Sequence, residues 1–183
     1  VVVLAGTGGN GGGALVCARR LHNYGAIARV YVTRPDAEFA PTPAHQLGIL
    51  RQMGVTIQHG TPDAATADLI VDGVIGYSLK GAPRDTAAGL IRWANANPAP
   101  VLSLDAPSGV DTTTGTVFDP AINATATMTL ALPKAGLHAS GVEAQIGELY
   151  LADISVPPAL YASPALGLNV PPIFAQSDIV RLR

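Results

Sequence analysis

A short apolar run at residues 1–5 (VVVLA) passes directly into a glycine-rich segment at residues 6–13 (GTGGNGGG). A short β-branched run that stops at glycine is typical of a strand buried in the middle of a parallel sheet. Apolar residues then recur at helical spacing from about residue 11 to residue 24, and Gly25 follows as a C-terminal cap. Strand, glycine loop and helix in this order predict the first unit of an α/β fold.

The same alternation continues along the chain. We expect strands at residues 1–5, 27–33, 55–58, 69–72, 101–104, 125–132 and 148–152, and helices at residues 11–24, 42–53 and 86–95. The second helix is expected to start with Thr42 as its cap and Pro43 in its first turn. Little helix is expected after residue 104, and the proline-rich tail from Pro157 onward is expected to wrap the surface. The pattern predicts a three-layer, Rossmann-like α/β fold with an open, mostly parallel sheet and helices on both faces.

Composition narrows the class of protein. The 183 residues are 48% hydrophobic and 13% charged, which predicts one well-buried domain over residues 1–183. A formal net charge of −2 gives no reason to expect nucleic acid or an anionic membrane as a partner. No apolar stretch is long enough to span a bilayer, and no secretion signal is evident, so we expect a cytoplasmic protein. The only cysteine, Cys17, is interpreted as a small buried apolar residue.

The chain starts inside a strand-like run, without methionine, so we expect that residues precede Val1 in the full protein. The four histidines show no spacing that is typical of metal ligands. The informative polar residues lie elsewhere, in three segments that follow predicted strands: residues 6–13, 76–83 and 105–111. Ligands of open α/β sheets bind beyond the carboxyl ends of the strands. Because parallel strands bring these ends to one edge, we expect the three segments to meet there.

The first segment fits the pattern G-x-G-x-x-G between a strand and a helix. Its backbone amides and the helix N-terminus favour an anion such as a pyrophosphate. The alternative is a tight turn that only lets the helix and strand pack closely. Asn10 is the one residue of this segment with a sizeable polar side chain, and its carbonyl oxygen could also bind a cation.

The other two segments, VDGVIGYSLKG and LDAPSGVD, add charged groups to the same edge. Asp72 closes a buried strand, so it needs either a bound cation or hydrogen bonds as a structural residue. Lys80 could meet a phosphate, or could be a solvated loop residue. Asp105 directly follows a strand, where it could serve as a general acid/base or could cap a turn.

These three segments together resemble the YjeF N-terminal domain family, the NAD(P)HX epimerases. That family carries G-x-G-N-N-G-G-D-G, V-D-A-x-x-G-x-x-x-x-G and D-x-P-S-G, and this chain has GTGGNGGGALVCARRL, DLIVDGVIGYSLKG and LDAPSGVD in the same order. The later stretches TATMTLALPKAGL and GELYLADISVP are similar to the closing strands of the family. The resemblance covers nearly the whole chain, and only the N-terminal helical segment of the family is missing.

The resemblance implies an isomerase that interconverts the R and S epimers of hydrated NADH and NADPH (NADHX and NADPHX). It implies one K⁺ per subunit, a homodimer, and an ADP- or ATP-dependent NAD(P)HX dehydratase as functional partner, which is often fused in bacteria. By position, K⁺ ligands are expected at Asn10, Asp72 and Ser108, and a catalytic, substrate-contacting carboxylate at Asp105. Substrate-binding residues are expected at Gly9, Asn10, Gly11, Gly12, Gly13, Gly76, Tyr77, Ser78, Leu79, Lys80, Gly81 and Ala82.

The chain departs from the family pattern in its first loop. An asparagine and an aspartate of the pattern are Gly9 and Gly13 here, and the following glycine is Ala14. This favours an alternative: a non-catalytic nucleotide-binding or dimerising scaffold of the same fold. A third reading is an ordinary NADP-dependent oxidoreductase in which Arg34, just past the second strand, meets a 2′-phosphate. Against it, the D-x-P-S-G segment has no role in that chemistry.

Overall fold

The computed structural model describes residues 1–63 and 66–183. Eight strands form one sheet in the order β3-β2-β1-β4-β5-β6-β7-β8, and all neighbouring pairs are parallel except β7 with β8. The strands are β1 (Val2–Ala5), β2 (Arg29–Val32), β3 (Thr56–His59), β4 (Ile70–Gly73), β5 (Val101–Leu104), β6 (Ala126–Leu130), β7 (Glu148–Ala152) and β8 (Ile179–Arg181). The predicted α/β class is confirmed.

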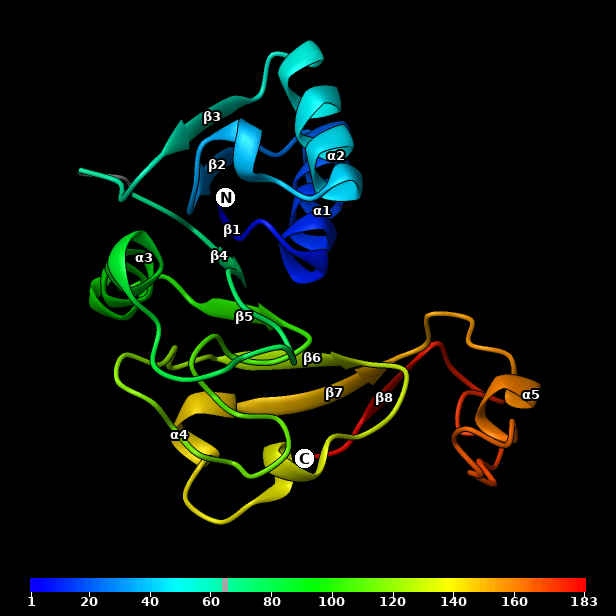
Figure 1. The fold of residues 1–183 in the computed structure, drawn as a ribbon. Helices are drawn as coiled ribbons and strands as arrows, with labels where there is room; N and C mark the ends of the chain where they lie inside the picture. Colours follow the sequence, from blue (N-terminus) through cyan, green and yellow to red (C-terminus); the bar gives the residue numbers. More distant parts are fainter. Residues whose placement is uncertain (64–65) are drawn as a thin grey trace.

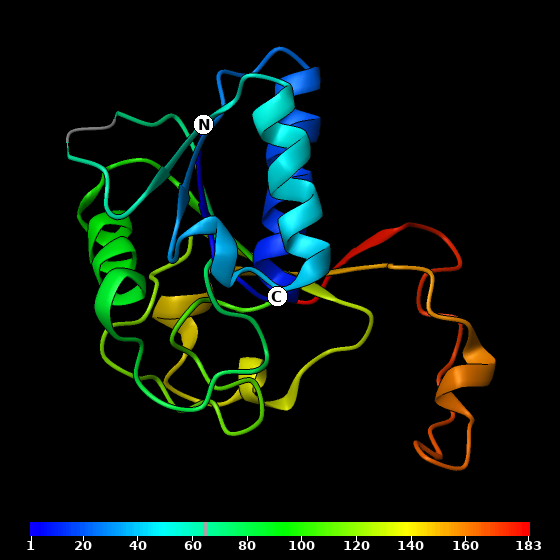
Figure 2. The same ribbon diagram turned by 45° about the horizontal axis from the view of Figure 1, so that its top comes forward.

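Three long helices cover the two faces of the sheet (Figures 1 and 2). They are α1 (Gly9–Asn23), α2 (Pro41–Gln52) and α3 (Asp85–Ala96), and the shorter elements are η1 (Asp36–Glu38), η2 (Ala135–His138), α4 (Glu143–Ile146) and α5 (Pro158–Tyr161). Within the described residues, no helix has the length and apolar content that crossing a membrane requires.

Successive side chains of β1 point to opposite faces of the sheet, which shows why helices are needed on both faces. Val3 and Ala5 pack in the cluster that contains α1 and α2, whereas Val2 and Leu4 pack in the cluster that contains α3. All four side chains are fully buried. A strand that is apolar on both faces is stable only between two helical layers. Its position in the centre of the sheet also explains why the sequence VVVLA has no polar residue.

Two local expectations were wrong. The second helix has Ala40 as its N-cap and Pro41 in its first turn, so it begins before Thr42. The tail does not wrap the surface: it leaves β7, extends away from the sheet around α5, and returns as β8 (Figure 1). There Leu151 pairs with Val180 in an antiparallel edge strand that the sequence did not suggest. Cys17 is only partly buried, although it packs against the α1–α2 cluster as expected.

Candidate functional site

A cavity of about 1780 Å³ lies at the edge of the sheet where the parallel strands end. Its lining includes segments that follow six strands: the glycine loop after β1, Thr33 and Arg34 after β2, residues 74–78 after β4, Asp105 after β5, Lys134 beyond β6, and residues 153–154 after β7. The three segments that the sequence singled out therefore contribute to one space. This agrees with the rule that ligands bind at the carboxyl edge of an open α/β sheet.

The glycine loop divides into glycines that packing requires and glycines that leave space. A Cβ atom at Gly6 would lie 2.0 Å from the carbonyl oxygen of Val74, and one at Gly11 would lie 1.8 Å from that of Gly6. Neither position can carry a side chain unless the backbone moves. At Gly9 and Gly13, by contrast, an added Cβ meets no atom within 4 Å. Both of these line the cavity, so their lack of side chains enlarges it.

Asp105 is the most constrained carboxylate of the cavity. It directly follows β5 and has φ 66°, a left-handed conformation that aspartate tolerates better than most residues. Its residue is buried, with 7% of its surface exposed. The amide of Tyr77 donates a hydrogen bond of 3.3 Å to Oδ2, and Lys134 Nζ lies 2.7 Å from Oδ1. One carboxylate oxygen is thus held by a cation, and the other is turned toward the loop after β4.

Lys134 is a functional candidate that the sequence reasoning missed. Its ammonium group donates to Thr129 Oγ1 at 2.7 Å and to the carbonyl oxygen of Leu130 at 3.2 Å, in addition to its ion pair with Asp105. These three acceptors use all three N–H bonds of the group. The available signal was its place in ALPKAGL, just past β6 at the same sheet edge. Such a lysine fixes the orientation of Asp105.

Asp72 is fully buried on β4, beside the cavity rather than in its lining. Its Oδ1 accepts hydrogen bonds from Ser108 Oγ at 2.6 Å and the amide of Val74 at 3.2 Å. Its Oδ2 accepts from Ser103 Oγ and the amide of Ser108, both at 2.9 Å. Burial raises the pKa of the carboxyl group, and the hydrogen bonds from Ser108, Val74 and Ser103 oppose that rise. In the described part of the chain, no lysine or arginine forms an ion pair with it.

The side-chain amide of Asn10 has an unsatisfied hydrogen-bond donor. Its Nδ2 is buried and has no hydrogen-bond partner among the residues that the structure describes. A Cβ at Gly76 would lie 3.0 Å from Asn10 Cβ and 3.1 Å from Asp105 Oδ2, so these two side chains flank Gly76. A half-turn of the amide about χ2 would instead offer Oδ1 to a cation. An unpartnered amide, together with a buried carboxylate that lacks a counter-ion, suits a hard monovalent cation. Among the described residues, no group of three or more His, Cys, Asp or Glu side chains is arranged so that it could bind a metal ion.

Comparison with known proteins decides the family. The family model described as YjeF-related protein N-terminus matches residues 1–136. The chain belongs to this family. A protein of Dehalogenimonas lykanthroporepellens named NAD(P)H-hydrate epimerase is 40% identical over 183 residues, which are 100% of this chain and 72% of that protein. A protein of the same name from Weissella koreensis is 34% identical over 157 residues, 85% of this chain and 71% of the relative.

A further relative is a much longer protein than this chain. A Salinibacter ruber protein named bifunctional NAD(P)H-hydrate repair enzyme Nnr is 36% identical over 174 residues, 86% of this chain but only 32% of that protein. The chain thus corresponds to about a third of this bifunctional relative. Among solved structures, the crystal structure of yeast ynu0, YNL200c, matches 100% of this chain and 76% of that chain, with a TM-score of 0.78 and 26% identity.

Against the expected site of the YjeF-related family, the structure divides the sequence-based candidates into two groups. Those that line the cavity are Gly9, Asn10, Gly11, Gly13, Gly76, Tyr77, Ser78 and Asp105. Those outside its lining are Gly12, Asp72, Leu79, Lys80, Gly81, Ala82 and Ser108. Gly12 faces α2, since an added Cβ would lie 3.4 Å from Pro43 Cγ. Lys80 is exposed and does not contact the cavity, so no placement in the structure favours its role at a phosphate.

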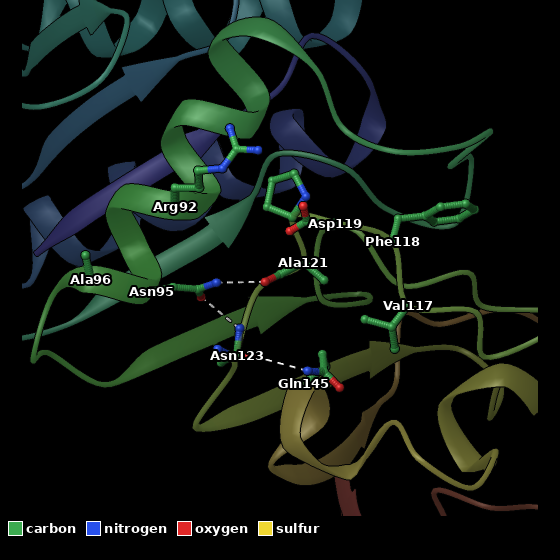
Figure 3. A pocket seen from close by; sticks show the side chains of 10 residues that line it. Arg92, Asn95, Ala96, Val117, Phe118, Asp119, Ala121, Asn123 and Gln145 are labelled. Carbon is green, nitrogen blue, oxygen red and sulfur yellow. Dashed lines mark hydrogen bonds between the residues drawn. The ribbon is translucent and has the colours of Figure 1, made fainter.

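A second cavity, of about 600 Å³, lies between the C-terminal end of α3, residues 117–123 and α4 (Figure 3). It is near the amino ends of β5 and β6, away from the glycine loop. Asn95 Nδ2 donates to the carbonyl oxygen of Ala121 at 2.8 Å, and its Oδ1 accepts from the amide of Asn123 at 2.9 Å. Gln145 Nε2 donates to Asn123 Oδ1 at 3.2 Å. These amides tie the loop to the two helices, which is a structural role.

Proposed function

We propose that this chain is an NAD(P)H-hydrate epimerase, which interconverts the R and S forms of hydrated NADH and NADPH. The observation that carries the proposal is the Asp105–Lys134 pair at the wall of the large cavity, beside the glycine loop. Membership of the YjeF-related family and the names of the relatives support it. The cavity offers both things that the reaction needs: amides for a pyrophosphate and a held carboxylate for proton transfer.

A carbon that carries a hydroxyl group is inverted when a bond at this carbon breaks and re-forms on the other face, as in loss and return of water. A carboxyl group nearby can give a proton to the leaving oxygen and take it back when the oxygen returns. Asp105 is suited to this role because Lys134 holds Oδ1, whereas Oδ2 accepts only a 3.3 Å hydrogen bond from Tyr77 and keeps acceptor capacity. The left-handed backbone at Asp105 turns the carboxylate toward the loop after β4. Lys134 uses its three donors within the protein, so we assign it to positioning and Asp105 to the proton transfer.

We propose one K⁺ per subunit, held by Asn10, Asp72 and Ser108. The unpartnered Asn10 amide and the buried Asp72 carboxylate favour this site. When bound, the ion supplies a counter-charge for the carboxylate and a link between the loops after β1, β4 and β5. In the described residues, Ser108 and Asp72 already bond to one another, so the ion would join an existing network rather than create one.

We further propose that the protein is a cytoplasmic homodimer and that an ADP- or ATP-dependent NAD(P)HX dehydratase consumes its S product. The bifunctional relatives support the second point, because this chain corresponds to only about a third of such a protein. Light scattering of the purified chain tests the dimer. A coupled assay tests the partnership: the dehydratase alone should leave the R epimer, and addition of this chain should allow complete conversion.

The direct test of the epimerase follows the equilibration of separated R and S epimers of NADHX in potassium buffer by chromatography. We expect the protein to accelerate equilibration and Asp105→Asn to reduce the rate by about 10²-fold or more. Asparagine tolerates the left-handed backbone, so this variant should stay folded. Asp119→Asn, an exposed carboxylate at the second cavity, is the matched control. No acceleration at high protein concentration would exclude the proposal.

The second candidate is a non-catalytic nucleotide-binding or dimerising scaffold of the same fold. The open space at Gly9 and Gly13, where the family pattern has polar side chains, favours it. Titration calorimetry with ADP-ribose distinguishes the two candidates when it is combined with the epimerase assay. Binding without acceleration would support the scaffold, whereas binding with acceleration would support the enzyme.

A further inference from the structure

Four ligand-facing positions lie in spatial order along the carboxyl edge of the sheet. Asp105 follows β5, the loop at Gly76 follows β4, the glycine loop follows β1, and Arg34 follows β2. All four line the same cavity. Neighbouring strands are about 4.8 Å apart, so three spacings, or roughly 14 Å, separate the ends of β5 and β2. The cavity is thus an extended slot with a distinct group at each step.

A pyridine dinucleotide has its parts in a fixed linear order: nicotinamide, ribose, pyrophosphate, ribose and adenine. Under the proposed function, Asp105 acts on the hydrated nicotinamide and the glycine loop takes the pyrophosphate. The adenosine ribose then lies beyond the glycine loop, over the end of β2. The amide of Thr33 donates to the carbonyl oxygen of Ala5 at 3.1 Å, so Arg34 stands next to the start of that loop. This is the place where doubly wound folds distinguish NADP from NAD.

Arg34 is available at this place. Its side chain is 53% exposed, and its two ionic contacts, to Glu38 and Asp85, are both 3.8 Å long. At that distance they are ion pairs without hydrogen bonds, and pairs between exposed groups contribute little. The guanidinium group therefore has free N–H donors in a fork that matches a phosphate. The flanking carboxylates keep the arginine at the rim without occupying its donors.

The two positions that directly follow β2 carry no acidic residue that would bind an unmodified ribose. Asp85 lines the cavity beside Arg34, but it comes from the start of α3 and pairs with Arg34. Proteins that prefer NAD hold the 2′-hydroxyl with an acidic residue near the end of the second strand. Here residues 33 and 34 are Thr and Arg, and the first acid after β2 is Asp36. Its two oxygens accept hydrogen bonds of 2.7 and 2.8 Å from Arg51, which lowers the pKa of the Asp36 carboxyl group. Asp36, in η1, is thus paired with Arg51 of α2 and does not line the cavity.

We propose that Arg34 binds the 2′-phosphate of the adenosine ribose and gives this chain a preference for NADPHX over NADHX. The inference rests on the proposed function for the direction in which the dinucleotide lies. It also makes a prediction about binding alone, because the adenosine half of the ligand can be tested without the nicotinamide. Arg34 is then a specificity-determining residue that takes no part in proton transfer.

Calorimetry with ADP-ribose and 2′-phospho-ADP-ribose tests the proposal on the purified chain. We expect the wild type to bind the 2′-phosphorylated fragment more tightly, and Arg34→Gln to weaken that binding by about tenfold or more. Affinity for ADP-ribose should change by less than about twofold. Arg34→Lys should keep part of the preference, because it retains the charge without the fork. In the epimerase assay, Arg34→Gln should raise KM for NADPHX and leave kcat and the kinetics with NADHX nearly unchanged.

Arg84→Gln is the matched control, since Arg84 is a second exposed arginine in the cavity lining. It removes the same charge from the same space, so a general electrostatic effect would appear equally in both variants. The proposal is overturned if the wild type binds the two fragments equally or binds neither. It is also overturned if Arg34→Gln weakens both alike, or if Arg84→Gln reproduces its effect. If the wild type binds the 2′-phosphorylated fragment more tightly but accelerates no epimerisation, the proposed function is refuted. The proposal that Arg34 binds the 2′-phosphate would then still stand.

Discussion

The large cavity at the carboxyl ends of the strands and the small cavity beside α3 differ in whether their polar groups have hydrogen-bond partners. At the amino ends of the strands, the side-chain amides of Asn95 and Asn123 form hydrogen bonds with neighbouring residues. The small cavity that they line lies where a loop packs against two helices. At the carboxyl ends, Asn10 has a buried amide nitrogen that finds no partner in the described part of the chain, and Asp105 has a left-handed backbone conformation. Unmet hydrogen bonds and strained backbone cost stability, and they persist where a ligand uses them.

The two cavities therefore differ in the groups that line them as well as in volume. Both spaces contain amides and carboxylates, but of the two only the larger one is lined by residues from six strand ends and holds a carboxylate against a lysine. It follows that variants in the large cavity should change activity beyond their effect on stability, whereas variants in the small cavity should change stability alone.

Lys134→Met should have the largest effect. It leaves the nearly buried Asp105 carboxylate without its counter-ion, so we expect the free energy of unfolding to fall by about 3 kcal/mol and epimerase activity to fall by about 10²-fold. Urea unfolding and the epimer assay measure the two. The double variant Asp105→Asn/Lys134→Met removes the orphaned charge, so it should regain stability without activity. A Lys134→Met protein that is as stable as wild type would contradict the buried ion pair.

Asp72→Asn should come next. Whichever way the new amide turns, its NH₂ group faces a backbone N–H, that of Val74 or that of Ser108, and we expect a loss of about 1–3 kcal/mol. If the cation site is correct, K⁺ should raise the Tm of the wild type more than Na⁺ does, and this response should vanish in the variant. Ser103→Ala is the control, because it removes one hydrogen bond and keeps the charge. An unchanged K⁺ response in Asp72→Asn would refute the site.

Asn95→Ala tests the other side of the comparison. It removes two hydrogen bonds that join α3 to residues 121 and 123, so we expect a loss of about 1–2 kcal/mol in the free energy of unfolding. The rate of epimerisation by the folded protein should not change. Gln145→Ala should cost less, because its single bond to Asn123 is 3.2 Å long. A fall in kcat for Asn95→Ala at full occupancy of the folded state would show that the small cavity has a functional role.

Gly9→Asn/Gly13→Asp should produce the smallest change, and a favourable one. Both positions are open, and Gly13 lies in the second turn of α1, where aspartate in place of glycine should raise the free energy of unfolding by only a few tenths of a kcal/mol. Polar side chains there should also raise kcat/KM severalfold by contacting the substrate. Gly9→Ala/Gly13→Ala separates the two effects, since alanine supplies helix propensity alone. If both double variants have the same kcat/KM as wild type, the missing side chains have no part in the reaction.

Local pattern was sufficient for most of the fold and for the location of the site. The bounds predicted for β5 and β7 match the structure, because each is a short run with leucine at every second position. The convergence of three loops followed from parallel strands alone. The edge strand β8 was missed because its three residues carry no periodicity of their own, and only pairing with β7 makes them a strand. Thr42 was misread as a cap because Pro41 could also open the helix.

The site needed spatial information that a sequence does not contain. Lys134 and Asp105 are in different loops, and their contact depends on β5 and β6 being neighbours in register. The open space at Gly9, compared with the closed space at Gly11, depends on which side of α1 meets the backbone of Gly6. The motifs thus indicated candidate site residues, whereas the structure showed which side chains contact each other, as Asp105 and Lys134 do.

The central position of β1 has a consequence for how the chain acquires its structure. Its neighbours are β2 and β4, and the second of these begins about 65 residues after β1 ends. At a synthesis rate of roughly 5–20 residues per second, β1 waits about 3–13 seconds before its second neighbour has been made. During that interval a fully apolar strand has one edge exposed to other nascent chains. Expression at low temperature or with chaperones should therefore change the soluble yield of this protein more than any single surface substitution.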